Sequence, residues 1–95
     1  MQNGLIEVQI PWRVEEIEAN AFRACSNLSR VTFIGGSDLR VIGRCAFHSC
    51  AALHELELNC VRELKEGCFQ DSGLRKIVLP KKLQNVEDEA FKGCK

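Results

Sequence analysis

Hydrophobic and polar positions along this chain follow one phrase that recurs four times. The phrase begins with a leucine and has further apolar residues three and five positions later. A pair of apolar residues three apart follows, and the phrase closes on alanine, phenylalanine and, three residues on, cysteine. This self-similarity predicts a stack of repeated structural units. The predicted repeats cover residues 5–27, 28–52, 53–73 and 74–95.

The phrase defines eight columns of residues that are expected to face a common core. Over four repeats the columns give 32 positions, of which 31 are apolar or cysteine, against 45% for the whole chain. Ser72 is the exception. A unit of about 22 residues cannot bury its own apolar side, so neighbouring units must cover it. The aromatic column consists of Phe22, Phe47, Phe69 and Phe91.

Local periodicity predicts the elements within each repeat. Residues 8–10, 31–33, 56–58 and 77–79 alternate apolar with other side chains, as strands with one buried face do. The segments that close each phrase are expected to be short 3₁₀ or helical turns on the opposite wall. The predicted fold is therefore a β-rich α/β solenoid with one parallel β ladder along one wall.

The phrase written out as LxxVxIP…VxxIxxxAFxxC resembles the BspA-type leucine-rich repeat, also called the Treponema pallidum type. The resemblance extends from Leu5 to Cys94. It implies four stacked leucine-rich repeats and a surface or interaction protein, because that family has no shared catalytic site. The chain departs from the pattern mainly in the third repeat. The departures are Asn59 for proline, Cys68 for alanine, Ser72 for cysteine, and a two-residue insertion around Gly35 and Gly36.

Composition excludes several classes of protein. The 95 residues suit a single domain, and 13 basic residues balance 13 acidic ones. Nucleic-acid and membrane-surface binders usually carry a basic excess, so neither partner is expected. No apolar run is long enough to insert in a membrane, and residues 1–4 leave no room for a signal peptide. The compartment stays unknown: a reducing interior is favoured, with the cell surface as the alternative.

Six cysteines invite hypotheses about disulfides and reactive thiols. Four of them occupy core columns, where free cysteine behaves as a small hydrophobe. A bridge between Cys25 and Cys50 is disfavoured because side chains in register point in parallel. Cys45 and Cys60 lie outside the columns and are the candidates for reactive or disulfide-forming thiols. The core-column cysteines are Cys25, Cys50, Cys68 and Cys94.

Metal and catalytic chemistry are not expected. Cys45, His48 and Cys50, followed by His54, have ligand types at close spacing. The columns place Cys50 in the core and both histidines outside it, so these side chains cannot meet on one ion. The pair Gly35–Gly36 lacks the lysine and the strand–loop–helix context of a phosphate-binding loop. No enzyme activity, metal or cofactor is therefore predicted.

Charges alternate between neighbouring repeats. The first outward strand position carries, in order along the chain, Glu7, Arg30, Glu55 and Lys76. Whole repeats follow the same rule, with net charges of −2, +2, −3 and +3. Opposite charges on adjacent strands favour one register and oppose slippage. These four residues also belong to the candidate protein-binding face.

Apolar residues outside the core columns mark a candidate contact patch. Trp12, the only tryptophan, follows Pro11 at the end of the first predicted strand, and Ile34 aligns with Pro11 in the next repeat. Val78 is expected to face outward from the last strand. Exposed tryptophan with apolar neighbours is a frequent composition of binding hot spots. The alternative is that Trp12 folds over the segment Gly35–Gly36 and contributes only local packing.

Two classes of function stay open from the sequence. The first is a non-catalytic protein–protein interaction or scaffold module, as a structural subunit or a segment of a larger assembly. The alternative is a cell-surface adhesin-type repeat segment that binds host or extracellular proteins. Solenoids require capping, so we expect protein partners, further repeats or head-to-tail self-association to cover the two ends. The chain is accordingly interpreted as one domain, residues 1–95, that is either a fragment of a longer array or a subunit whose ends are covered by partners.

Overall fold

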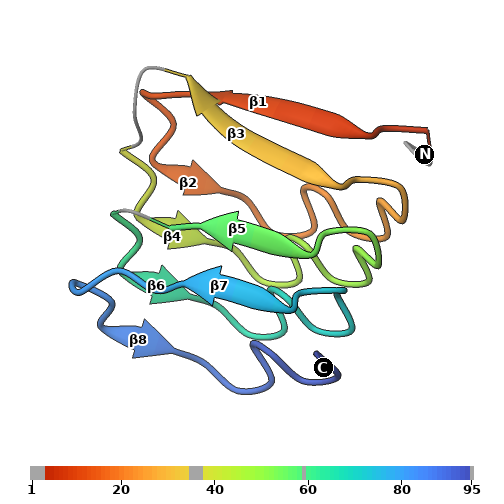
Figure 1. Ribbon diagram of the computed structural model, residues 1–95. Helices are drawn as coiled ribbons and strands as arrows, with labels where there is room; N and C mark the ends of the chain where they lie inside the picture. The colour runs from red at the N-terminus through yellow and green to blue at the C-terminus, as the bar shows by residue number, and fades with distance from the viewer. Residues whose placement is uncertain (1–3, 35–37, 59, 95) are drawn as a thin grey trace.

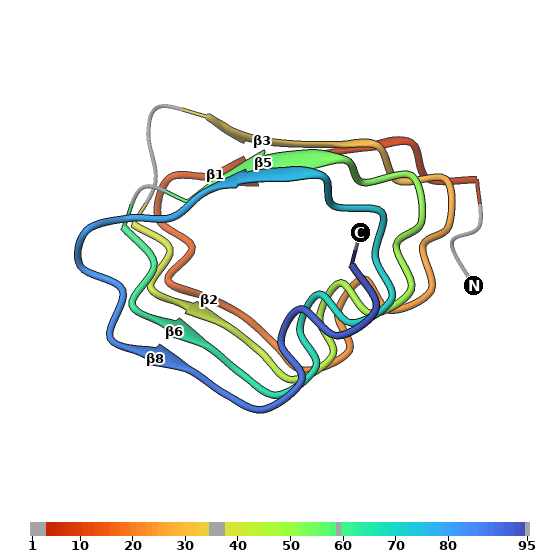
Figure 2. The same ribbon diagram turned by 60° about the horizontal axis from the view of Figure 1, so that its bottom comes forward.

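The computed structural model describes residues 4–34, 38–58 and 60–94, which form a β-solenoid of about three turns with parallel strands (Figures 1 and 2). Strands alternate between two walls as the chain winds. One wall consists of β1 (Glu7–Pro11), β3 (Arg30–Ile34), β5 (Glu55–Glu57) and β7 (Lys76–Val78). The other consists of β2 (Glu16–Ile17), β4 (Val41–Ile42), β6 (Glu63–Leu64) and β8 (Asn85–Val86).

The two walls differ in how their strands are paired. The even-numbered strands form one four-stranded parallel sheet in the order β2-β4-β6-β8, here called the continuous wall. The odd-numbered strands form two separate parallel pairs, β1-β3 and β5-β7, here called the split wall. The prediction of one parallel ladder is therefore wrong. The apolar pairs of each repeat are extended enough to form two-residue strands, and the predicted ladder is divided.

The segments that close each repeat lie at one corner of the solenoid, as Figure 2 shows, and are called the turn strip. Within the described ranges no residue is assigned to a helix, so the prediction of 3₁₀ or helical turns is not confirmed. Two residues per repeat instead have positive φ, for example Asn20 at 63° and Ala24 at 62°. Their N–H groups donate to Arg44 O and His48 O of the next repeat, at 2.9 and 2.8 Å. These cross-repeat bonds alternate with single-turn bonds along the chain, such as that from Cys25 N to Phe22 O at 3.2 Å, so the consecutive bonds that a helix requires are missing.

Every buried apolar side chain among the described residues lies in a predicted core column. The four phenylalanine rings stack along the solenoid with centroids 5.4, 5.5 and 5.6 Å apart. Three predicted core residues are exposed instead: Ala21, Leu79 and Val86. They belong to the first and last predicted repeats, where only one neighbouring repeat covers the columns. No helix in the described part of the chain is long and apolar enough to span a membrane.

Candidate functional site

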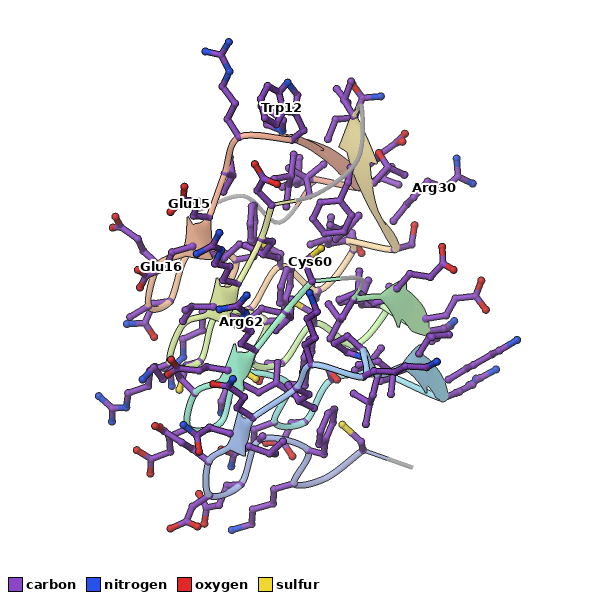
Figure 3. All side chains as sticks on the ribbon, turned by 90° about the vertical axis from the view of Figure 1, so that its left-hand side faces the viewer. Trp12, Glu15, Glu16, Arg30, Cys60 and Arg62 are labelled. Atoms are coloured by element: carbon purple, nitrogen blue, oxygen red, sulfur yellow. The ribbon has the colours of Figure 1, made fainter. Side chains whose placement is uncertain are left out.

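The carboxyl ends of β1 and β3 carry an exposed apolar cluster, called the Trp12 rim. It comprises Pro11, Trp12 and Ile34. Pro11 and Ile34 are partners in the β1-β3 register. The exposed fractions of Trp12 and Ile34 are 47% and 52%, too high for core residues. Figure 3 shows Trp12 at the first-repeat end of the molecule. The structure therefore brings together three of the four apolar residues that the sequence singled out.

Backbone hydrogen bonds hold the chain beneath the Trp12 side chain. The N–H of Val14 donates to Pro11 O at 3.1 Å, and that of Asp38 donates to Trp12 O at 3.0 Å. The Arg13 guanidinium carbon lies 5.3 Å from the centroid of the Trp12 ring, within the range of a cation–π contact. An exposed ring on a fixed backbone loses little freedom when it binds. The hypothesis that Trp12 covers Gly35–Gly36 lies outside the described residues.

Val78 lies apart from the Trp12 rim. It is exposed, as predicted, but it is on β7, where its register partner is Glu57 of β5. The paired strands β5 and β7 are separated from β3 by the division of the split wall. Val78 therefore belongs to a different part of the surface.

The four alternating charges are aligned only in part. Glu7 is the register partner of Arg30, and Glu55 is the register partner of Lys76. Arg30 and Glu55 are not register partners, because β3 and β5 are not paired, so the alternation does not set the register at this step. Among the described side chains, none of these four forms an ion pair within 4.0 Å. The ion pairs lie elsewhere: Arg44 with Glu66 (3.6 Å), Lys65 with Glu63 (2.9 Å) and Glu87 (3.6 Å), and Lys92 with Glu89 (3.4 Å).

A groove of about 920 Å³ runs between β3 and β5, at a place the sequence did not indicate. Three core-column residues line it: Val31, Phe33 and Leu56. Val31 and Phe33 are only partly buried, although both lie in an inner repeat. The division of the split wall therefore opens the core to the surface. The remaining lining residues are Ser29, Arg30, Thr32, Ala52, His54, Glu55, Glu57, Lys76 and Val78.

The cysteines lie largely where the columns place them, and all six are free thiols. The predicted burial is confirmed for three of the core-column cysteines, Cys25, Cys50 and Cys68. Cys94 is half-buried. Burial raises the pKa of Cys50 to about 11 and that of Cys68 to about 12, so both stay protonated at neutral pH. The Cys50 thiol donates to the Phe22 carbonyl at 3.1 Å. These thiols serve packing and hydrogen bonding.

The side chains that were considered as metal ligands lie in different environments. Cys50 is buried, His54 is exposed, and the Nδ1 atom of His48 lies 2.8 Å from the Ser49 hydroxyl oxygen. In the part of the chain that the structure describes, no three His, Cys, Asp or Glu side chains gather as a metal site would require. Cys60 is exposed and Cys45 is half-buried, and both lie outside the core columns as predicted.

Stacked turns of parallel strands that repeat a Leu-x-x-apolar-x-apolar phrase are typical of leucine-rich repeat solenoids. The chain belongs to the BspA type leucine rich repeat family, whose region model matches residues 1–95 in six copies. A leucine-rich repeat protein from Bacteroides ovatus has a similar crystal structure, with a TM-score of 0.86 and 29% sequence identity. That match covers 97% of this chain and 24% of the Bacteroides protein. A search among curated proteins found no match. The repeat fold is generally non-enzymatic, and such repeats generally mediate protein binding.

Proposed function

We propose that this chain is a non-catalytic protein–protein interaction or scaffold module, acting as a structural subunit or segment of a larger assembly. The observation that carries the proposal is the Trp12 rim. Trp12 and Ile34 expose about half of their surface beside Pro11, above a backbone fixed by hydrogen bonds. Aromatic side chains on a rigid support are frequent anchors of protein interfaces. The core columns, by contrast, are occupied by packed apolar side chains.

The partition into four repeats is part of the same proposal. It is supported by the four strands of the continuous wall and by the stack of four phenylalanines. The Bacteroides ovatus protein is about four times as long as the match. This is consistent with our interpretation of the chain as one segment of a longer array. The outer faces of the first and last repeats are then surfaces for further repeats or for partners.

Quantitative affinity capture from the native source tests the Trp12 rim. The bait would be the whole chain, in parallel with Trp12→Ala and with Glu18→Lys, which changes an exposed residue outside the rim, directly after β2 of the continuous wall. We expect at least one protein to be retained by the unchanged chain and by Glu18→Lys but not by Trp12→Ala. With the purified partner, Trp12→Ala should weaken binding at least tenfold while lowering the free energy of unfolding by no more than about 1 kcal/mol.

Two results would contradict this function. One is the absence of any protein retained specifically by the unchanged chain. The other is a Trp12→Ala variant that melts at a lower temperature and still binds the partner normally. That outcome would show that Trp12 contributes local packing alone.

Head-to-tail self-association is a finer part of the proposal. Leu79 and Val86 expose about half of their surface on the last repeat, whose net charge is opposite to that of the first. Light scattering during size-exclusion chromatography should show a mass that rises with concentration. Replacing both residues with lysine should remove that rise. A constant monomer mass for the unchanged chain would exclude self-association.

A further inference from the structure

The corner that leads from the turn strip into β7 is shorter than the equivalent corners of the first two repeats. Cys25 and Cys50 each lie three positions before the leucine that starts the next repeat, whereas Ser72 lies two positions before Leu74. The single residue in between is Gly73, whose N–H donates to Cys50 O at 3.0 Å. The third repeat therefore turns this corner, at the amino end of β7 in Figure 1, with one residue fewer.

Glycine permits the short corner, and a hollow of about 250 Å³ lies beside it. A Cβ atom on Gly73 would collide with the carbonyl oxygen of Ala51, so no larger residue fits there. Gly93, on the last repeat, has a φ of 80°, a conformation that other residues rarely adopt. Bare backbone therefore forms two parts of the wall of the hollow. The residues that line it are Ala51, His54, Ser72, Gly73, Arg75 and Gly93.

The two ionisable residues that line the hollow are both basic. The N–H of Arg75 donates to His54 O at 2.8 Å, so the two side chains start from neighbouring positions of adjacent repeats. The His54 ring lies against Gly73, since its Cδ2 atom would be 3.1 Å from a Cβ atom at that position. Among the described side chains, neither Arg75 nor His54 forms an ion pair within 4.0 Å. When His54 is protonated the two charges repel each other, and an anion between them would remove that repulsion.

A buried hydroxyl group also lines the hollow. Ser72 is the one polar residue of the core columns and is only 5% exposed. Its Oγ atom lies 3.4 Å from the Sγ atom of Cys94, and that thiol donates its own proton to Phe69 O at 3.1 Å. Because sulfur is a weak acceptor and a serine hydroxyl rotates, this hydroxyl can donate to a stronger acceptor placed in the hollow. The hollow thus has one buried neutral donor beside two basic side chains.

Neighbouring acidic groups limit the positive charge of the hollow. Asp71 adjoins it, because its Oδ1 atom occupies the place that a Cβ atom on Gly93 would take. On its other side, His54 borders the larger groove, where two acidic residues balance two basic ones. The charges of Arg75, protonated His54 and Asp71 leave a net positive charge, which is cancelled once His54 loses its proton. The charged groove residues are Arg30, Glu55, Glu57 and Lys76.

We infer that the hollow binds one oxyanion, a carboxylate or a phosphate group, between Arg75 and His54, with the Ser72 hydroxyl as a third donor. A guanidinium group donates two parallel hydrogen bonds to such oxygens, and charge-assisted bonds of this kind are strong. A binding module would use the hollow to hold one acidic or phosphorylated side chain of its partner. This use rests on the proposed function, but the Trp12 rim contributes no residue to the hollow.

The test uses inorganic phosphate and acetate, each added to the whole chain at constant ionic strength while nuclear magnetic resonance records the amide signals. At pH 6, the amides of Gly73 and Gly93 should shift along a saturable curve with a millimolar dissociation constant, and that of Gly43 should not shift. Acetate keeps its charge between pH 6 and pH 8, so its binding should weaken about threefold at pH 8 as His54 loses its proton. The probe that binds more tightly at pH 6 identifies the group, phosphate or carboxylate, that the hollow prefers.

Variants separate the three donors from the rest of the surface. Arg75→Gln should weaken phosphate binding about tenfold, and Ser72→Ala about threefold. His54→Gln should also weaken it and should remove the pH dependence of acetate binding. Asp71→Asn should instead strengthen binding about threefold, a gain that a damaged fold could not produce. Arg40→Gln is the matched control, because Arg40 is an exposed arginine directly before β4, and it should leave the affinity unchanged.

Three results would overturn the inference. The first is the absence of a saturable shift at Gly73 and Gly93 with either probe. The second is an Arg75→Gln variant that binds phosphate as tightly as the unchanged chain. The third is equal weakening by Arg40→Gln, which would mean a general attraction to surface charge. Any of these, together with Trp12-dependent capture of a partner, would leave the proposed function standing. Loss of that capture with anion binding intact would contradict the proposed function alone.

Discussion

The two walls of the solenoid are built from the same repeated phrase, yet only one is continuous. In the continuous wall, Gly43 N donates to Ile17 O at 2.7 Å, and Lys65 N donates to Ile42 O at 3.0 Å. The same bond recurs at each step from one repeat to the next. In the split wall, the bonds stop between β3 and β5. Stacking of repeats is thus maintained on one side while the other side opens a groove to the core.

The turn strip explains how the molecule tolerates an open wall. At the step where the split wall opens, Cys45 N donates to Glu66 O at 3.0 Å, Phe47 N donates to Cys68 O at 2.8 Å, and Ser49 N donates to Gln70 O at 2.9 Å. Equivalent sets of three bonds occur at the steps before and after. The repeats are therefore joined at two of their three sides throughout. The split wall, which is the third side, is therefore not needed to hold these two repeats together.

The largest expected effect compares two phenylalanines of the second repeat. Phe47 is 0% exposed and stacks between two rings, so Phe47→Ala should cost about 4 kcal/mol of unfolding free energy. Phe33 is only partly buried beside the groove, so Phe33→Ala should cost about 1.5 kcal/mol. Urea unfolding of both variants measures the difference. Equal losses of unfolding free energy in the two variants would show that Phe33 is as well buried as Phe47.

Glycine substitution tests how closely the repeats approach in the continuous wall. A Cβ atom on Gly43 would lie 2.6 Å from Ile17 O and 2.7 Å from Ala19 N, and neither backbone atom can move without breaking the stacking. Gly43→Ala should therefore destabilise the protein by about 2 kcal/mol. Gly4 has no atom within 4 Å of such a Cβ, so Gly4→Ala is the matched control and should change stability by less than about 0.5 kcal/mol. If Gly43→Ala leaves the free energy of unfolding unchanged, the repeats can move apart in this wall more easily than its hydrogen bonds indicate.

Two buried thiols make the stability of the protein depend on pH. Because burial raises the pKa of Cys50 to about 11 and that of Cys68 to about 12, the folded state keeps protons that the unfolded state loses near pH 9.0. Stability from these groups is fully present below pH 9 and falls as pH rises toward 11, by up to about 1.4 kcal/mol per pH unit for each thiol. Unfolding measured at pH 8, 9 and 10 should show this decline, and Cys68→Ala should reduce its slope.

Alkylation provides the control for that prediction. The exposed Cys60, which follows β5 in the third repeat, should react with iodoacetamide at pH 8 well before the buried thiols do. Peptide mapping by mass spectrometry would give the order of modification. Modification of Cys50 or Cys68 at the rate of Cys60 would contradict the burial on which the pH prediction depends.

The sequence predicted the core far better than it predicted the walls. The phenylalanine column identified the ring stack, because each ring occupies the same position in every repeat. The strands of the continuous wall were missed because two residues, as in Glu16–Ile17, are too few to show a period. The Trp12 rim could be predicted from apolar residues left outside the columns. The groove was not predicted, because β3 and β5 share the same alternation; the insertion around Gly35 and Gly36 marked an irregularity after β3 but did not indicate an open wall.

The smallest predicted effect concerns the longest of the predicted repeats. The spacing from Phe22 to Phe47 is 25 residues, against 22 for each later step, and the sequence places the insertion around Gly35 and Gly36, directly after β3. Because β5 and β7 pair at the regular spacing, we predict that deleting both glycines lets β3 pair with β5. Two or three regained backbone bonds should raise the unfolding free energy by about 1 kcal/mol and protect the Val31 amide from exchange. If the Val31 amide exchanges with solvent equally fast after the deletion, the insertion is not the reason why β3 and β5 stay unpaired.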